Sequence, residues 1–156
     1  MERVKVQGKA KIRSRLSCRV FRDGEVITEK VLGTKCITDA FVNLLVDTLI
    51  ANDDGIKNFK YHGIGTGTGD ESADDTDLET EVETRVTGTQ VEGATGNIYE
   101  SVGSFTLTGD HNISEHGLFN ASEAGTLMDR TKFTALPLLT NDTIEFTYEA
   151  TFSSGG

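Results

Sequence analysis

The clearest pattern of apolar and polar positions lies near the end of the chain, in residues 144–152. Apolar and polar residues alternate there without a break, with Ile144, Phe146, Tyr148, Ala150 and Phe152 on one side and Glu145, Thr147, Glu149 and Thr151 on the other. A two-residue period places successive side chains on opposite faces of a strand. The pattern therefore predicts a half-buried β-strand whose polar face lies in water or at a subunit contact.

Residues 113–133 predict a β-hairpin. A block of small and polar residues separates two apolar segments, which is typical of a hairpin loop longer than the two-residue turns. If Phe119 lies opposite Leu127, then Ile113 lies opposite Phe133, and both apolar pairs share one face. This apolar register predicts a strand pair in the middle of a two-layer protein.

A register shifted by one residue is the alternative for this hairpin. It pairs Glu115 with Arg130 and His116 with Asp129, and it turns every side chain to the opposite face. We favour the apolar register, because the burial of apolar side chains outweighs an exposed ion pair, which contributes only about 0–1 kcal/mol.

Residues 16–32 predict a second hairpin. Asp23-Gly24 is a strong signal for a two-residue turn. Counting outward from this turn places Val20 opposite Ile27, so that one side of the hairpin is apolar.

Residues 38–52 form the one segment with a convincing helical period. Thr38 suits the N-cap position and Asp39 suits the positive end of the helix dipole. The apolar residues make two neighbouring rows, Phe41, Leu45 and Leu49 in one and Val42, Val46 and Ile50 in the other. Such a broad apolar face predicts an amphipathic helix that packs flat on a sheet.

Further short strands are predicted at residues 59–64, 82–90 and 98–108, between glycine-rich and polar turns. Together these patterns give about eight short strands and one helix, a spacing typical of a sandwich or jelly roll. We therefore predict an all-β fold, a jelly-roll-like β-sandwich that residues 1–156 form as a single domain.

Two segments between the predicted strands raise the question of ligand binding. The glycine-rich residues 63–69 lack the Lys-Ser or Lys-Thr pair of a phosphate-binding loop, and Thr68 stands where the dinucleotide pattern needs glycine. Residues 70–83 are acidic but lack the spacing of an EF-hand. We interpret the first segment as a flexible turn and the second as a solvated acidic loop, with a weak cation site as the alternative.

Few residues are candidates for catalysis. The histidines, His62, His111 and His116, show no metal-ligand spacing on one element. His116, beside Glu115 and near Asp129 in the shifted register, suits a base with an orienting carboxylate, but no nucleophile accompanies it. We expect a structural histidine, no catalytic activity, no bound metal and no cofactor.

The two cysteines do not form a disulfide framework. The turn at residues 23–24 places Cys18 opposite Glu29 and leaves Cys36 beyond the hairpin. We expect both thiols to be reduced, in an intracellular setting. No apolar run approaches the ~20 residues of a membrane span, and the charged N-terminus does not fit a signal peptide.

Charge is distributed unevenly along the chain. Residues 1–35 hold ten Lys and Arg against four Asp and Glu, a balance of +6, and residues 36–156 hold five against twenty-one, a balance of −16, which sum to −10. The acidic body would repel nucleic acid and anionic membranes, so we expect neither as a partner. The N-terminal segment would attract an acidic surface.

The N-terminal residues 1–15 allow two interpretations. Apolar and basic positions alternate loosely from residue 3 to residue 14, which fits a solvated edge strand whose basic side chains prevent aggregation. The other interpretation is a basic arm that docks on a partner. Nucleic acid is a weak third option, because no aromatic residues are interleaved with the basic ones.

Several stretches carry a family resemblance. They are residues 38–47, Tyr61-His62 leading into Gly65-Thr66-Gly67, residues 97–99, 113–119 and 125–130, and Gly155-Gly156. Together they resemble the small capsid-decorating, or cement, proteins of tailed bacteriophages, and similar sequence motifs occur in phage tail-appendage proteins. The resemblance covers the chain from about residue 13 to its end.

This resemblance implies a jelly-roll-like β-sandwich that assembles as a homotrimer on the capsid shell and has no enzymatic activity. We expect a virion protein, made in the cytoplasm of a bacterial host, that binds the major capsid protein on the outside of the shell and stabilises it. The alternative is a tail fibre or baseplate component involved in host attachment. A lectin-like or enzymatic sandwich outside the virion is a weaker third hypothesis.

The charge asymmetry predicts how such a protein attaches. The candidate capsid-contact residues are Lys5, Lys9, Lys11, Arg13 and Arg15, on the side that faces the shell, with the acidic run turned outward or sideways. Each exposed ion pair contributes only about 0.2–1 kcal/mol, but three copies in a trimer would add through avidity. Apolar strand faces would hold the trimer itself together.

Overall fold

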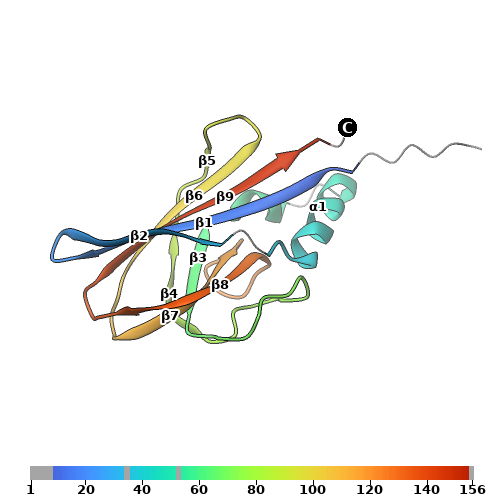
Figure 1. The fold of residues 1–156 in the computed structure, drawn as a ribbon. Coiled ribbons are helices and arrows are strands. Elements are labelled where there is room, and N and C mark those ends of the chain that lie inside the picture. Colours follow the sequence, from blue (N-terminus) through green and yellow to red (C-terminus); the bar gives the residue numbers. More distant parts are fainter. Residues whose placement is uncertain (1–8, 34–35, 52–53, 155–156) are drawn as a thin grey trace, which may run out of the picture.

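The computed structural model describes residues 9–33, 36–51 and 54–154 and contains two antiparallel β-sheets that pack face to face (Figure 1). The five-stranded sheet has the strand order β2-β1-β9-β6-β5, and the four-stranded sheet has the order β4-β3-β7-β8. The predicted all-β sandwich is confirmed.

The described residues form nine strands and two helical segments. The strands are β1 (Lys11–Arg22), β2 (Glu25–Gly33), β3 (Tyr61–Gly65), β4 (Glu81–Thr87), β5 (Val91–Glu92), β6 (Ile98–Thr106), β7 (His111–Phe119), β8 (Leu127–Leu138) and β9 (Thr143–Ser153). Helix α1 (Asp39–Ala51) and the 3-10 helix η1 (Asp54–Asn58) lie between β2 and β3 in the chain. The predicted strands were thus found close to their expected positions.

Strand β9 supplies much of the core between the sheets, as its alternation predicted. Ile144, Phe146, Tyr148 and Ala150 are fully buried. Phe152, the last apolar residue of the series, is 37% exposed near the end of the strand. The polar side chains of β9 lie on the outer face of the five-stranded sheet.

The β1–β2 hairpin turns at Asp23 and Gly24, which have φ angles of 51° and 79°. Positive φ at both positions is the geometry of the type I′ turn that the Asp-Gly sequence predicted. A register shift next to Val20 then moves the pairing by one residue, so that Val20 lies opposite Thr28 and not Ile27. The predicted register was therefore wrong beyond the turn.

Strand β1 is a central strand over most of its length. It pairs with β9 from Lys11, opposite Ser153, to Phe21, opposite Thr143. On its other side, β2 covers it only from Leu16 onward. The predicted edge-strand environment thus applies to residues 11–15 alone, and the part of the basic segment before residue 9 lies outside the described residues.

The β7–β8 hairpin contains two register shifts, and the predicted apolar register was only partly right. Phe119 lies opposite Leu127 as predicted, whereas Ile113 lies opposite Leu136 and not Phe133. The shift between Ile113 and Glu115 adds two residues to β8, and the shift between Leu118 and Phe119 adds one, as a β-bulge does. A pattern of apolar residues cannot locate such an insertion.

The alternative register was also wrong. Glu115 lies opposite Lys132, and His116 lies opposite Thr131. The side chain of Glu115 nevertheless reaches Arg130 diagonally across the strand pair, at 2.8 Å. This contact is fully buried, whereas the sequence argument had treated it as exposed.

Helix α1 begins at the predicted N-cap. The Thr38 hydroxyl accepts a hydrogen bond from the Phe41 amide at 3.2 Å and donates one to the Leu127 carbonyl. The hydroxyl therefore caps the helix and also ties it to β8. Phe41, on the first predicted row, is buried.

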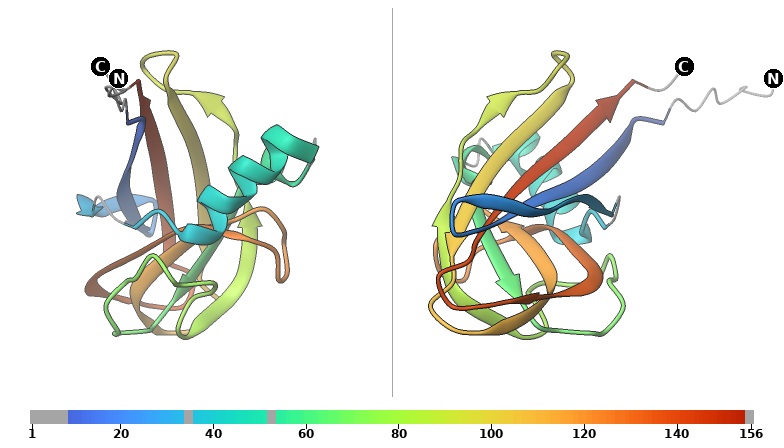
Figure 2. Two further views of the ribbon diagram at one scale, coloured as in Figure 1. Left: turned by 90° about the vertical axis from the view of Figure 1, so that its right-hand side faces the viewer. Right: turned by 60° about the vertical axis from the view of Figure 1, so that its left-hand side comes forward.

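The prediction that both apolar rows of the helix pack on a sheet was wrong. Leu49 and Ile50 are 87% and 80% exposed, and Val42 and Val46 are also exposed. The helix lies at one side of the sandwich and extends away from the sheets toward its C-terminal end (Figure 2).

Candidate functional site

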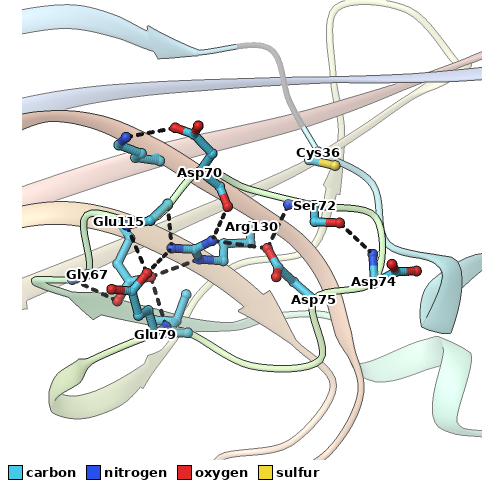
Figure 3. Close-up of polar contacts among 12 residues, drawn as sticks. Cys36, Gly67, Asp70, Ser72, Asp74, Asp75, Glu79, Glu115 and Arg130 are labelled. Carbon is cyan, nitrogen blue, oxygen red and sulfur yellow. Dashed lines mark hydrogen bonds and ion pairs between the residues drawn. The ribbon is translucent and has the colours of Figure 1, made fainter.

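The polar centre of the molecule is the guanidinium of Arg130, which lies on the outer face of the four-stranded sheet (Figure 3). Its side chain is 3% exposed, and it forms ion pairs with Glu115 at 2.8 Å, Asp75 at 3.0 Å and Glu79 at 3.5 Å. It also donates hydrogen bonds to the carbonyls of Asp70 and Gly69. The loop of residues 66–80 is thereby held against the sheet.

The carboxylate of Glu115 is the fully buried partner in this network. It accepts hydrogen bonds from the backbone amides of Gly67, Glu79 and Thr80 at 2.8–3.0 Å, in addition to Arg130. Burial alone would raise the pKa of Glu115, but the Thr80 amide, Arg130 and the other two amides lower it below its usual value. Glu115 therefore stays ionised, and its stabilising contribution is lost only as the pH falls through that lowered pKa.

Glycines make room for this carboxylate. A methyl group on Gly67 would lie 2.6 Å from a carboxylate oxygen of Glu115, and one on Gly65 would overlap both Glu115 and the Thr80 carbonyl. The glycine-rich segment is therefore not the flexible turn that we predicted. It is the end of β3 and the start of a loop, in which the Gly67 amide donates to Glu115 and the Gly69 amide donates to Glu79.

The acidic run was also predicted incorrectly in part. Asp75 and Glu79 pair with Arg130, and Asp70 pairs with Lys132 at 2.9 Å. Only some of these carboxylates are solvated, because Arg130 and Lys132 of β8 and Arg85 of β4 pair with part of the run. Within the described residues, no group of three or more His, Cys, Asp or Glu side chains could hold a metal ion.

The interior of the sandwich contains a short chain of polar groups. His62 Nδ1 lies 2.9 Å from His116 Nε2, and His62 Nε2 lies 2.9 Å from the Ser101 hydroxyl. Burial lowers the pKa of His62 to about 3, and burial together with His62 lowers the pKa of His116 well below its usual value. Two protonated rings would direct N–H groups at one another, so the pair is stable only when it is not doubly charged.

The proposed pairing of His116 with an orienting carboxylate was wrong. The Glu115 carboxylate lies on the other face of the sheet with Arg130, and Asp129 hydrogen-bonds to Thr131 at 2.8 Å and more weakly to Tyr148. His116 and Asp129 are both fully buried. They act on the stability of the fold and do not face a substrate.

The cations of β1 fall into two groups. Arg15, which was predicted as a contact residue, pairs with Glu149 of β9 at 3.3 Å, and two further arginines pair as Arg19–Glu145 at 2.7 Å and Arg22–Asp142 at 2.7 Å. Lys9, Lys11 and Arg13 are exposed and form no ion pair within the described part of the chain. Lys5 lies outside the described residues.

Two grooves border the beginning of β1. One, of about 570 Å³, lies between residues 12–14, residues 36–37 and residues 70–71. The other, of about 490 Å³, lies between residues 13–15 of β1 and Thr151 of β9. Lys11 and Arg13 therefore lie on the part of β1, before Leu16, with which β2 does not pair.

Cys18 and Cys36 are both free thiols, as predicted. Cys18 lies opposite Lys30 and not Glu29, and burial raises the pKa of its thiol to about 11, which makes it a poor nucleophile. None of the helices that the structure describes has the length and apolar character of a membrane span.

Comparisons of the chain with protein-family models, with curated proteins and with solved structures found no match.

The sequence predicted the basic residues of β1 as contact residues, but it did not predict the network around Arg130. Glu115 and Arg130 were expected to pair only in the shifted register of the 113–133 hairpin, which we did not favour. The signal available in the sequence was the combination of a glycine-rich segment, an acidic run and a hairpin that contains one Glu and one Arg between apolar residues. These three features are the parts of one network.

Replacing Gly65 by Ala tests whether the glycines are needed to admit the Glu115 carboxylate. The added methyl group meets a backbone carbonyl as well as the carboxylate, so we expect the free energy of unfolding in urea to fall by about 3 kcal/mol or more. The control is Gly109→Ala, whose methyl group would lie 3.4 Å from its nearest neighbour, and whose effect should stay within about 0.5 kcal/mol. Equal effects of the two substitutions would contradict this account.

Replacing Asp129 by Asn tests the buried carboxyl group. Burial raises the pKa of Asp129 from 3.8 to about 7, so its contribution to stability is present at low pH and is lost as the pH rises through this range. Asn is neutral throughout. The free energy of unfolding of the variant, relative to the wild type, should therefore rise between pH 4 and pH 7 by up to ~1.4 kcal/mol per pH unit.

A control variant separates this effect from a loss of packing. Ile113→Val removes one buried methylene and should cost about 0.5–1.5 kcal/mol at every pH. A pH-independent difference for Asp129→Asn as well would show that Asp129 is ionised in the folded protein across the whole range.

Proposed function

We propose that the protein is a structural protein of a tailed-bacteriophage virion, a decoration protein that binds the outside of the capsid as a homotrimer and stabilises the shell. The stretches that resemble the cement proteins support this proposal. Residues 61–67, 113–119 and 125–130 lie in β3, β7 and β8 and in the loop after β3. They supply Glu115, Arg130 and the glycines around them, so the resemblance falls on the residues that hold the four-stranded sheet together.

The proposed contact surface rests on one observation: some basic side chains at and before β1 have carboxylate partners within the molecule and others do not. Toward the hairpin turn the arginines of β1 are paired within the molecule, whereas Lys9, Lys11 and Arg13 form no ion pair among the described residues. An unpaired, exposed cation is available to an acidic partner without first breaking an internal contact. The attractive surface is therefore the beginning of β1, and Arg15 contributes less to it than we expected.

The rest of the molecule suits a static binding role. Many of its buried polar side chains bind one another, in the Arg130 network and in the buried chain of His62, His116 and Ser101. Attachment to a shell needs no pocket, only a rigid surface that matches a repeated one. Three weak contacts in a symmetric trimer would then act together.

Charge reversal tests the contact surface. Lys11→Glu combined with Arg13→Glu should weaken binding to capsids that lack the protein by at least about tenfold, and increased salt should weaken wild-type binding. The matched control is Lys57→Glu combined with Lys60→Glu, which changes the net charge equally on another surface and should bind as the wild type does. The trimer should persist in both variants, as measured by light scattering.

Two results would contradict the proposal. Binding that is indifferent to salt and to both pairs of substitutions would show that β1 is a solvated strand and not a contact surface. Immunogold labelling of intact particles should place the protein on the head, and a signal on the tail would replace the capsid proposal with a host-attachment role.

A further inference from the structure

The first residues of β1 form an open strand edge. Residues 11–15 pair with β9 on one side, but β2 begins its pairing only at Leu16. Among the described residues no strand lies on the other side of this segment. Half of a strand's backbone N–H and C=O groups point to each side, so this edge presents unused hydrogen-bonding groups.

The two grooves described above lie along this edge. Arg13 and Ser14 line both grooves, whereas Ile12 and Ile37 line only the first, on the inner face, and Arg15 and Thr151 line only the second, on the outer face. A strand directs its side chains alternately to the two faces. An added strand could therefore place successive side chains in the two grooves without moving the sheet.

We propose that this edge binds an extended segment of another protein, which adds to the five-stranded sheet as a strand beside β1. The segment carries Asp or Glu at the positions that face Arg13 and Lys11, and apolar residues at the alternate positions that face Ile12 and Ile37. Backbone pairing supplies the affinity, and the two grooves supply the selectivity.

The basic side chains of β1 determine which side chains of the bound segment are favoured on the outer face of the sheet. Lys11 and Arg13 are exposed and form no ion pair among the described residues, and Arg15 has a single carboxylate partner. A basic segment would be repelled at each of these positions, whereas an acidic one gains a charge-assisted contact. The inner groove includes Ile12 and Ile37, which are only partly buried, and it is also lined by Asp70 and Glu71. An apolar side chain fits beside the two isoleucines, whereas a carboxylate in this groove would be repelled by Asp70 and Glu71.

Strands β4 and β5 of a second copy are poorer occupants. They are two of the edge strands of the sheets, with β2 and β8. The acidic side chains of β4 already bind within the molecule, since Glu81 pairs with Arg85 and Glu83 bonds to Thr108. Strand β5 is only two residues long.

The inference deepens the proposed function and rests on it for the identity of the partner, since a capsid subunit would supply the segment. The binding mode can be tested without a capsid. The probe is a synthetic, fluorescently labelled peptide of about eight residues that alternates Glu and Val, and the readouts are fluorescence anisotropy and amide hydrogen exchange of the whole protein.

We expect the Glu/Val peptide to bind and to slow amide exchange within residues 11–15. A Lys/Val peptide should bind at least about tenfold more weakly, and Arg13→Glu should weaken binding of the Glu/Val peptide by a similar factor, whereas Lys60→Glu should not. N-methyl groups on alternate peptide amides should abolish binding when they lie on the edge that pairs with β1. The same number of N-methyl groups on the opposite edge should have little effect.

Several outcomes would overturn the inference. These are the absence of binding at millimolar peptide, protection at β2 or α1 and not at residues 11–15, and equal loss of binding with both N-methylation patterns. Peptide-independent protection of residues 11–15 that depends on protein concentration would assign the edge to a second copy. Since head labelling of virions does not depend on this peptide, the inference can fail while the proposed function stands, and the reverse also holds.

Discussion

The buried ion pair between Glu115 and Arg130 is the interaction on which the other parts of the structure depend. Its two charges are taken out of water, so each must be satisfied within the protein. Glu115 meets this need with the Gly67 amide of the glycine-rich segment and the Glu79 and Thr80 amides of the acidic run. Arg130 meets it with the carboxylate of Asp75 and the carbonyls of Gly69 and Asp70. The backbone of Arg130 also pairs with Cys36 through two hydrogen bonds, which brings the chain to the N-cap of α1. One side-chain contact therefore organises a loop, a strand register and a helix start.

This arrangement explains which features the sequence could predict. Local signals were sufficient for the Asp23-Gly24 turn, the alternation of β9 and the Thr38 cap, because each depends on neighbouring residues. The predicted registers of both hairpins were wrong because bulges insert one or two residues that the apolar pattern does not mark. The register that pairs Glu115 with Arg130 was not favoured, because the stabilisation by this ion pair was estimated from exposed pairs. In the structure the pair is buried and Glu115 also accepts three amide hydrogen bonds, which make the contact strong.

The functional proposals rest on the charged side chains and the strand edge that lie outside this network. Part of the acidic loop and most arginines are paired inside the molecule, whereas Lys11 and Arg13, at the open beginning of β1, are exposed and form no ion pair among the described residues. The exposed apolar face of α1 is a second unsatisfied surface. A rigid sandwich with unpaired charge beside a free strand edge suits attachment to a larger assembly better than chemistry on a small substrate.

The most direct test of the central role of the ion pair is a double-mutant cycle with Glu115→Gln, Arg130→Met and the combined variant, measured by urea unfolding. Each single substitution leaves a buried group without its partner, so we predict a loss of about 3–5 kcal/mol for each. The combined variant should lose much less than the sum, with a coupling energy of at least about 2 kcal/mol. The single variants should also be cut faster in residues 66–80 by a Glu-specific protease. Additive losses within about 0.5 kcal/mol, with unchanged proteolysis of the loop, would contradict the account.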